Sequence, residues 1–310
     1  MARTRTGIVL TTFALIIAVL AACAGLALAW GGVRWQRATV QLRSRLDAAR
    51  KPAMPVSHVT HTTHTTHTTQ ATYDAREIEN LPSPVRRYFA AVLQDRQPII
   101  GGVRLSQTGQ FRPSEHAKTW RPFEATQVFT TAPPGFDWDA RISIAPGLTA
   151  FVHDAYVAGE GILHAEAFGL VTVADTRGTP EAAQGELLRY LAEALWFPTA
   201  LLPSQGVRWV AGDDSTASAT LSDGATTVSL QFCFDSEGLI ASFHAASRCR
   251  GVNEGVAEFA PWQGRFWSYE IRDGIRIPLE GEVAWQMPAG IFAYCRVRIQ
   301  DIEYAFTRPA

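Results

Sequence analysis

The sequence has no excess of charge of either sign. Its 310 residues contain 28 lysines and arginines against 29 aspartates and glutamates, which gives a formal net charge of −1. Proteins that bind nucleic acids carry a basic surface that meets the phosphates. The balanced charge provides no electrostatic basis for such binding, and we expect no nucleic-acid partner.

Cysteine is scarce, and none of the four cysteines belongs to a CxxC pair. Cys23 lies in an apolar N-terminal run, which leaves Cys233, Cys249 and Cys295 widely spaced in the rest of the chain. Structural zinc sites and disulfide frameworks need cysteines that are paired at short or regular spacings. The pattern argues against both, and it is compatible with a single disulfide as well as with none.

The sequence also lacks the common motifs of enzymes and cofactor sites. There is no GxSxG, no HExxH, no Walker A sequence and no GxGxxG. His164 and Glu166 form half of the zinc-deaminase signature, but the P-C-x-x-C half is missing. We therefore expect no cofactor and favour a non-enzymatic protein over an enzyme.

A long uncharged apolar run is present near the N-terminus. Residues 7–30 read GIVLTTFALIIAVLAACAGLALAW, which in a helix is long enough to span the ~30 Å hydrocarbon core of a bilayer. We favour an uncleaved single-pass anchor in contact with membrane lipids. Two alternatives stay open: a cleaved signal peptide, because residues 27–29 (ALA) fit the small-x-small pattern, and a lipoprotein, because residues 20–23 (LAAC) resemble a lipobox.

Residues 33–50 are expected to continue this helix as a basic juxtamembrane segment, so that residues 1–50 form one anchoring unit. Its basic residues outnumber the two arginines that precede the apolar run, which by the positive-inside rule favours a cytoplasmic body. The signal-like start and the threonine-rich segment that follows favour the outside, and we expect the body to be extracytoplasmic. Trp30 and Trp35 occupy positions expected of interfacial aromatics. Contact with lipid headgroups and a solvated stalk are both open for this segment.

A segment rich in threonine and histidine, residues 51–73, separates the helix from the body. Its repeat places four histidines three residues apart: His58, His61, His64 and His67. In a polyproline II helix they would lie on one edge at intervals of ~9 Å, too far apart to share a metal ion. We interpret residues 51–73 as a disordered linker, with weak metal binding by the four histidines as the alternative.

Residues 74–310 have the pattern of one β-rich globular domain. Apolar and polar residues alternate in four segments: 136–144, 226–234, 239–247 and 279–285. Such alternation is typical of antiparallel strands with one apolar face. Near residues 300–301 the alternation shifts from odd to even positions, which predicts a β-bulge.

The same alternation predicts the faces of four acidic and histidine side chains. Asp137 and Asp139 share the polar face of their strand, which we interpret as solvated, and His153 and Asp154 point to opposite faces.

One strong helix interrupts the strands. Residues 180–197 begin with a proline in the first turn and end before another proline, and the apolar residues 196–203 are predicted to continue as an extended segment. One helix is ~10 Å wide and cannot cover ten or more strands spaced at ~4.8 Å unless the sheet curls. The predicted fold class is therefore mainly β (α+β): a large curled antiparallel sheet, or half-barrel, with one covering helix and a preceding N-terminal transmembrane helix.

Several segments of the body resemble an uncharacterised bacterial family. They are LPSPVRRYF (81–89), GQFR (109–112), TWRPFEATQVF (119–129), FDWDA (136–140), YVAGEGIL (156–163), GELLRYLAEALWFPTALLP (185–203) and WQGRFWSYEIRDGIRIP (262–278). The resemblance covers about residues 78–306 and implies no activity. The fold that it implies is similar to the half-barrels of lipoprotein carriers (LolA- and LolB-like) in bacterial envelopes, and a shared fold does not establish a shared function.

The candidate binding site lies where the helix covers the sheet. Arg189, Tyr190 and Glu193 are expected at the mouth of a cavity, although Arg189 and Glu193 also fit a surface ion pair between residues four positions apart. Large aromatic residues are candidates for its lining, with simple core packing as the alternative. They are Trp120, Trp138, Trp196, Trp209 and Trp267. We expect the sheet to wrap loosely and to leave the ~300–1,000 Å³ of an ordinary ligand site.

The sequence therefore favours a membrane-anchored binder or carrier of a lipid or another apolar ligand. An enzyme that uses the polar residues at the cavity mouth is one alternative. A structural or interaction domain of the cell envelope is the other.

Overall fold

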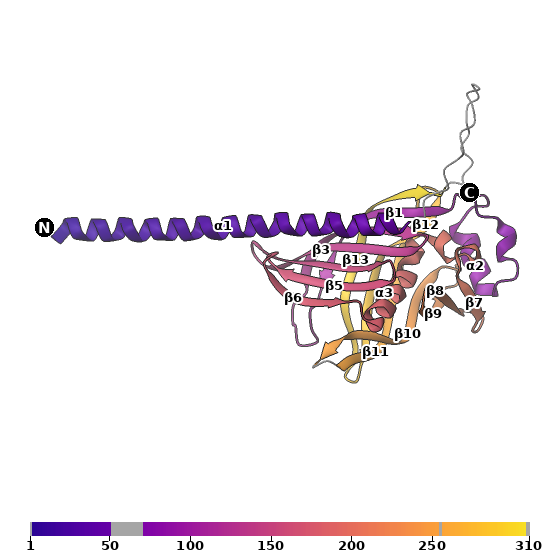
Figure 1. The fold of residues 1–310 in the computed structure, drawn as a ribbon. Helices are drawn as coiled ribbons and strands as arrows, with labels where there is room; N and C mark the ends of the chain where they lie inside the picture. Colours follow the sequence, from indigo (N-terminus) through magenta and orange to yellow (C-terminus); the bar gives the residue numbers. More distant parts are fainter. Residues whose placement is uncertain (1, 51–70, 254–255, 308–310) are drawn as a thin grey trace, which may run out of the picture.

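The computed structural model describes residues 2–50, 71–253 and 256–307, so the four histidines of the repeat lie outside the described residues. Helix α1 (Ala2–Ala49) is continuous, and its N-terminal part extends away from the body while its C-terminal part lies against it (Figure 1). Among the described residues, α1 is the helix that is long and apolar enough to cross a membrane.

A single antiparallel sheet of 13 strands forms the described body. The strands are β1 (Ile100–Phe111), β2 (Arg121–Thr131), β3 (Pro134–Ala145), β4 (Leu148–Val157), β5 (Glu160–Ala167), β6 (Val171–Arg177), β7 (Arg208–Ala211), β8 (Thr216–Asp223), β9 (Thr226–Phe234), β10 (Ile240–Asn253), β11 (Val256–Arg272), β12 (Ile275–Met287) and β13 (Gly290–Phe306). Their spatial order is β6-β5-β4-β3-β2-β1-β13-β12-β11-β10-β9-β8-β7. Neighbouring strands are thus consecutive in the sequence everywhere except at the centre, where β1 pairs with β13. The consecutive strands β6 and β7 form the two opposite edges.

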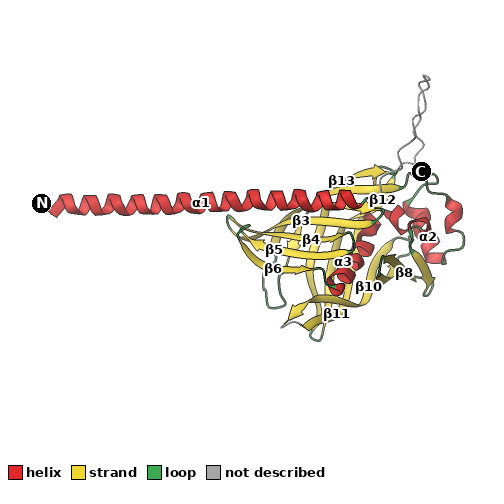
Figure 2. Cartoon of the chain, in the orientation of Figure 1, coloured by secondary structure: helices red, strands yellow, loops and turns green. Residues whose placement is uncertain are grey.

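The sheet curls around helix α3 (Pro180–Glu193), which lies inside the curve (Figure 2). Strands β3 to β6 run roughly along α1 (Figure 2). The prediction of a curled antiparallel half-barrel is confirmed. The predicted bulge is confirmed too, because Ser106 pairs with Asp301 and Gln107 pairs with Ile299, which leaves Gln300 without a partner in the ladder.

Short helices precede β1 and follow α3. They are η1 (Ala75–Ile78), α2 (Ser83–Val92), η2 (Ala194–Trp196), η3 (Pro198–Leu201) and η4 (Pro203–Gln205). The predicted extended conformation after α3 is wrong, because the two prolines stand at the first positions of 3-10 turns, where a missing N–H costs nothing. The segment still covers the core, since Leu201 and Leu202 are fully buried.

The C-terminal part of α1 packs against the outer face of β3, β4 and β5 through a stripe of buried residues. The stripe consists of Gly31, Trp35, Thr39, Leu42 and Leu46, which are spaced by three or four residues as one helix face requires. A β-carbon at Gly31 would lie 2.5 Å from the carbonyl oxygen of Phe168, so the close approach of helix and sheet depends on glycine at this position. Trp35 is only 2% exposed. The prediction that Trp35 is an interfacial aromatic is therefore wrong.

A hydrogen-bonded network fills the centre of this contact. Trp35 Nε1 donates to Asp139 Oδ1 (2.9 Å), and Arg43 Nε donates to Asp137 Oδ2 (2.8 Å). The other oxygen of Asp137 lies 2.7 Å from His153 Nδ1, and Thr39 Oγ1 lies 3.0 Å from His153 Nε2. Asp137 and Asp139 share a face as predicted, but that face is buried under α1 and is not solvated.

Further arginines of α1 pair with acidic residues of the sheet. Arg34 pairs with Glu166, and Arg45 Nη2 lies 2.6 Å from Glu160 Oε2. With Arg43, three of the basic side chains that were expected at headgroups or in solvent thus have acidic partners on the body.

The chain leaves α1 and re-enters the body at the same end of the sheet. Arg50 Nη2 donates to the carbonyl oxygen of Gly101 (3.1 Å), and the backbone of Ala71 bonds to Ile99 and Thr307. Consequently the docked residues 31–50, and not the histidine-rich segment between these points, fix the distance from the apolar run to the body. The four cysteines, all within the described residues, are free thiols.

Candidate functional site

A cavity of about 100 Å³ lies between α3 and the inner face of the sheet. Aromatic side chains form much of its wall: Phe111, Trp138, Trp196, Phe243, Trp262, Phe266 and Tyr294. Its volume is below the ~300–1,000 Å³ that is usual for ligand sites. The prediction of a loosely wrapped sheet is therefore wrong, because Leu187 and Leu191 of α3 and Leu195 of η2 are fully buried in the core.

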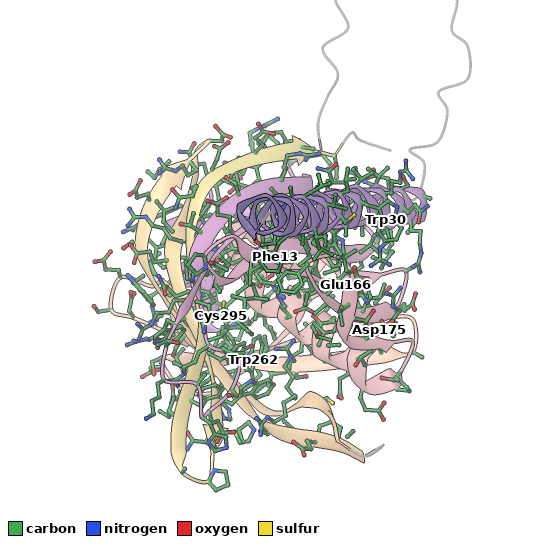
Figure 3. All side chains as sticks on the ribbon, turned by 90° about the vertical axis from the view of Figure 1, so that its left-hand side faces the viewer. Phe13, Trp30, Glu166, Asp175, Trp262 and Cys295 are labelled. Atoms are coloured by element: carbon green, nitrogen blue, oxygen red, sulfur yellow. The ribbon has the colours of Figure 1, made fainter. Side chains whose placement is uncertain are left out.

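One end of the cavity lies at the end of the half-barrel toward which the apolar part of α1 points. Along α1, Arg43 contacts Asp137 and Trp35 contacts Asp139, so the N-terminal direction of α1 follows the C-terminal direction of β3. At that end of the sheet the chain turns from β1 into β2, and the last residue of β1, Phe111, lines the cavity. Figure 3 views the protein from this end, with Trp262 and Cys295 between the two walls of the sheet.

Five charged side chains meet beside the cavity. Arg189 lies between Asp154 of β4 and Glu193 of α3, with a distance of 2.8 Å from Arg189 Nε to Glu193 Oε1. Arg248 of β10 donates to Glu186 Oε1 (3.2 Å) and to the carbonyl oxygen of Gly185 (3.1 Å). Asp154 Oδ1 and Glu186 Oε2 are buried and find no hydrogen-bond partner among the described residues. Asp154 Oδ1 is an acceptor, whereas the Glu186 carboxyl donates a hydrogen bond when it is protonated, either to Asp154 or to a ligand.

Aromatic rings and amides hold these charges in place. The Arg248 guanidinium lies 4.3 Å from the ring centre of Trp262, and that of Arg189 lies 5.0 Å from the ring centre of Trp138. Both distances are within the range of a cation–π interaction. A chain of hydrogen bonds also runs from Trp138 Nε1 through Gln107 and Gln127 to Glu193 Oε2. The cluster is therefore anchored on both the sheet and the helix.

Protonation of Glu186 is shifted by its surroundings. Burial raises the pKa of the Glu186 carboxyl well above its ordinary value of 4.5, the charge of Asp154 raises it further, and Arg248 and Arg189 oppose the shift. Burial also raises the pKa of the Cys295 thiol to about 12. Cys295 therefore stays protonated at neutral pH, which argues against a role as a nucleophile.

The Glu186→Gln variant should become increasingly stable relative to the wild type as the pH rises above about 4.5. A carboxyl whose pKa is higher in the folded than in the unfolded chain stabilises the fold only below its unfolded pKa, and this stabilisation is lost at about 1.4 kcal/mol per pH unit until the folded pKa is passed. Glutamine does not titrate. Denaturant unfolding at a series of pH values would measure the difference, with Glu181→Gln in the first turn of the same helix as the control. Parallel pH profiles for wild type and Glu186→Gln would contradict the shifted protonation.

The region that carries this cluster matches a protein family over most of its length. Residues 79–304 match the family of unknown function DUF6920. The chain belongs to this family. The match confirms the resemblance inferred from the sequence, and all five residues of the charged cluster lie within the DUF6920 region.

Solved structures and curated proteins add little to this assignment. A LolA superfamily protein from Nitrosomonas europaea is 9% identical, with a TM-score of 0.33 over 74% of this chain and 93% of its own. A β-barrel-like protein of the domain of unknown function DUF1849 from Brucella abortus is also 9% identical, with a TM-score of 0.14 over 67% of this chain and 99% of its own. At these scores neither structure defines the fold or the ligand of the DUF6920 chain. No curated protein matches the sequence.

The structure brings together four of the predicted site residues. Arg189, Glu193, Trp138 and Trp196 all line the cavity of the DUF6920 domain. Trp196 also donates Nε1 to the carbonyl oxygen of Pro278 (3.1 Å), which fixes the indole at the wall.

The other four predicted residues lie outside the cavity wall. Tyr190 packs between Phe129 and Phe197 in the core. Trp209 packs against Phe89 of α2. Trp120 stacks with the guanidinium groups of Arg112 and Arg296. Trp267 lies on the outer face, where it lines a broad groove of about 700 Å³ and donates to Glu280 (2.8 Å). That groove is an open surface concavity with charged side chains that pair with one another, as Arg298 does with Glu280.

Four residues of the site were not predicted from the sequence: Asp154, Glu186, Arg248 and Trp262. The alternation that separates His153 from Asp154 places Asp154 on the inner face, and this was the available signal for it. Arg248 follows a register shift in the pairing of β10 with β11, so simple alternation does not predict its direction. Among the described residues, no group of three His, Cys, Asp or Glu side chains is placed to hold a metal ion.

Proposed function

We propose that this protein is a membrane-anchored, non-enzymatic binder of an amphipathic lipid that enters the half-barrel from the side facing the membrane. The observation that carries the proposal is the aromatic-lined cavity, which reaches the same end of the sheet as the apolar part of α1. In this proposal residues 1–50 anchor the chain, residues 51–73 form a linker and residues 74–310 form the binding domain. The domain lies on the extracytoplasmic side of the cell membrane.

Two features of the cavity define the chemistry of the ligand. The aromatic walls suit an apolar chain or ring. Asp154 Oδ1 accepts a hydrogen bond and a protonated Glu186 donates one, so this pair suits a head group that carries a hydroxyl group. A volume of about 100 Å³ holds a head group or a short apolar segment, so a complete acyl chain requires α3 to move away from the sheet.

One observation favours an enzyme as a second candidate. The raised pKa of Glu186 would supply a proton donor beside a second carboxyl group, Asp154, in a site that excludes water. General acid catalysis uses such a group. Conversion of the bound lipid would distinguish an enzyme from a binder.

The test is native mass spectrometry of the full chain, released from nanodiscs made of a bacterial lipid extract. Wild-type protein is expected to retain one class of lipid. The Cys295→Phe variant, which fills the cavity wall, should lower its occupancy at least about tenfold. Cys233→Phe adds the same ring to the outer face of β9 and should leave occupancy unchanged.

Two results would refute the binder. One is the absence of retained lipid on the wild type. The other is equal occupancy in a Cys295→Phe variant that has kept its melting temperature. A mass change in the retained lipid that disappears in Glu186→Gln would support the enzyme instead.

A further inference from the structure

We infer that the membrane-facing end of the body, at the β3–β4 and β5–β6 turns, contacts the lipid headgroup layer through exposed apolar side chains. The inference rests on the membrane anchor of the proposed function. It is independent of any ligand in the cavity.

The apolar run of α1 is joined to the body by a continuous, closely packed helix. Helix α1 continues without a break from the apolar run into the docked stripe, and Gly31 packs directly on the backbone of Phe168 and Gly169. Arg34 strengthens this point by donating to the carbonyl oxygen of Gly169 (2.7 Å) and by pairing with Glu166. The end of the apolar run therefore has a fixed position relative to the β5–β6 turn.

The β5–β6 turn lies close to the end of the apolar run. Gly31 follows the last residue of the apolar run, Trp30, by one residue, which is ~1.5 Å along the helix. The headgroup region of a bilayer is about 5–7 Å thick on each side of the hydrocarbon core. A turn that packs on Gly31 must therefore lie within or next to the headgroup layer when α1 spans the bilayer.

Exposed apolar side chains gather at this end of the body. Val171 and Val173 of the edge strand β6 are 58% and 62% exposed, and Leu148 and Ile144 beside the β3–β4 turn are also exposed. The two turns are neighbours, because the amide of Phe168 donates to the carbonyl oxygen of Thr149 (2.9 Å). A cluster of apolar side chains on the solvent-exposed surface of a protein marks a site of interaction with a partner. The position of α1 makes that partner the bilayer itself.

The opposite edge of the sheet supplies a matched control. Val210 of β7 is 56% exposed, on an edge strand like Val171, but β7 lies at the end of the body farthest from the N-terminal part of α1 (Figure 1). Exposed valine on an edge strand thus occurs both next to the expected membrane surface and far from it.

The test uses the full chain in nanodiscs, with its four cysteines replaced by alanine and one cysteine reintroduced for an environment-sensitive fluorophore. Three positions are compared: Phe13→Cys in the apolar run, Val171→Cys, and Val210→Cys. Spin-labelled lipids in the bilayer quench fluorophores that contact it. We expect strong quenching at positions 13 and 171, with at least twofold more quenching at 171 than at 210.

The outcomes separate the inference from the anchor on which it rests. Quenching at position 13 together with equal, weak quenching at positions 171 and 210 would overturn the inference and leave the anchor standing. Absence of quenching at position 13 would refute the anchor, and the headgroup contact with it.

Discussion

Replacing Arg189 with methionine should lower the free energy of unfolding by about 3–5 kcal/mol, which is the usual effect of removing one partner from a buried ion pair. Arg189 is the cation between Asp154 and Glu193, and both carboxyl groups would remain buried without it. Methionine keeps most of the apolar stem against Phe136 and Trp138, so the loss would report the charge and not the packing. Urea unfolding of the wild type and the variant under the same conditions measures the difference.

Two further variants serve as controls for Arg189→Met. Arg177→Met removes a cation of similar size that pairs with Asp175 on the exposed strand β6, and its effect should stay below about 1 kcal/mol. Adding Glu193→Gln to Arg189→Met removes one of the stranded charges and should restore part of the stability. Equal effects of Arg189→Met and Arg177→Met would show that the cluster is not a buried electrostatic unit.

Trp35→Ala should detach the C-terminal part of α1 from the sheet. The indole stacks on His153 at 4.5 Å between ring centres and donates to Asp139, so truncation removes a buried aromatic side chain and leaves a buried acceptor oxygen unpaired. Large-to-small replacement of a buried tryptophan costs about 3–5 kcal/mol. Amide hydrogens of residues 31–49 should therefore exchange at least about 100-fold faster, because exchange of a docked element follows its local opening free energy.

Arg37→Ala is the control for this experiment, since Arg37 lies on the exposed side of the same helical segment. Its exchange rates should match those of the wild type. Unchanged protection of residues 31–49 in Trp35→Ala would mean that the network around Asp137 and Asp139 does not hold the helix on the sheet.

The strands could be predicted from the sequence because a half-buried sheet imposes strict alternation. The segments at residues 136–144 and 226–234 fall inside β3 and β9, and the change of phase near Gln300 marks a true bulge. Alternation reports which residues share a face, but it does not report what covers that face. Asp137 and Asp139 were placed on the correct face for this reason, and their burial under α1 was missed.

The docking of α1 was hidden by the composition of its contact stripe. Gly31, Thr39 and three larger residues repeat with helical spacing, but a glycine and a threonine carry no hydrophobic signal. Close backbone approach and polar pairing stabilise this contact, and neither property is visible as periodicity. The charge cluster at the cavity was missed for a related reason, because its members come from β4, α3 and β10, which only the curl of the sheet brings together.

Because α1 is one continuous helix, its apolar run and the body would tilt together relative to a bilayer. The helix contains 48 residues and is ~72 Å long at 1.5 Å per residue. Spanning helices commonly tilt by about 20°, and the angle changes with the thickness of the hydrocarbon core. If α1 spans a bilayer, any such change in tilt would rotate the half-barrel by the same angle, because α1 is continuous from the apolar run to residues 31–49. Local bilayer thickness would thus set the angle at which the open end of the half-barrel meets the membrane surface.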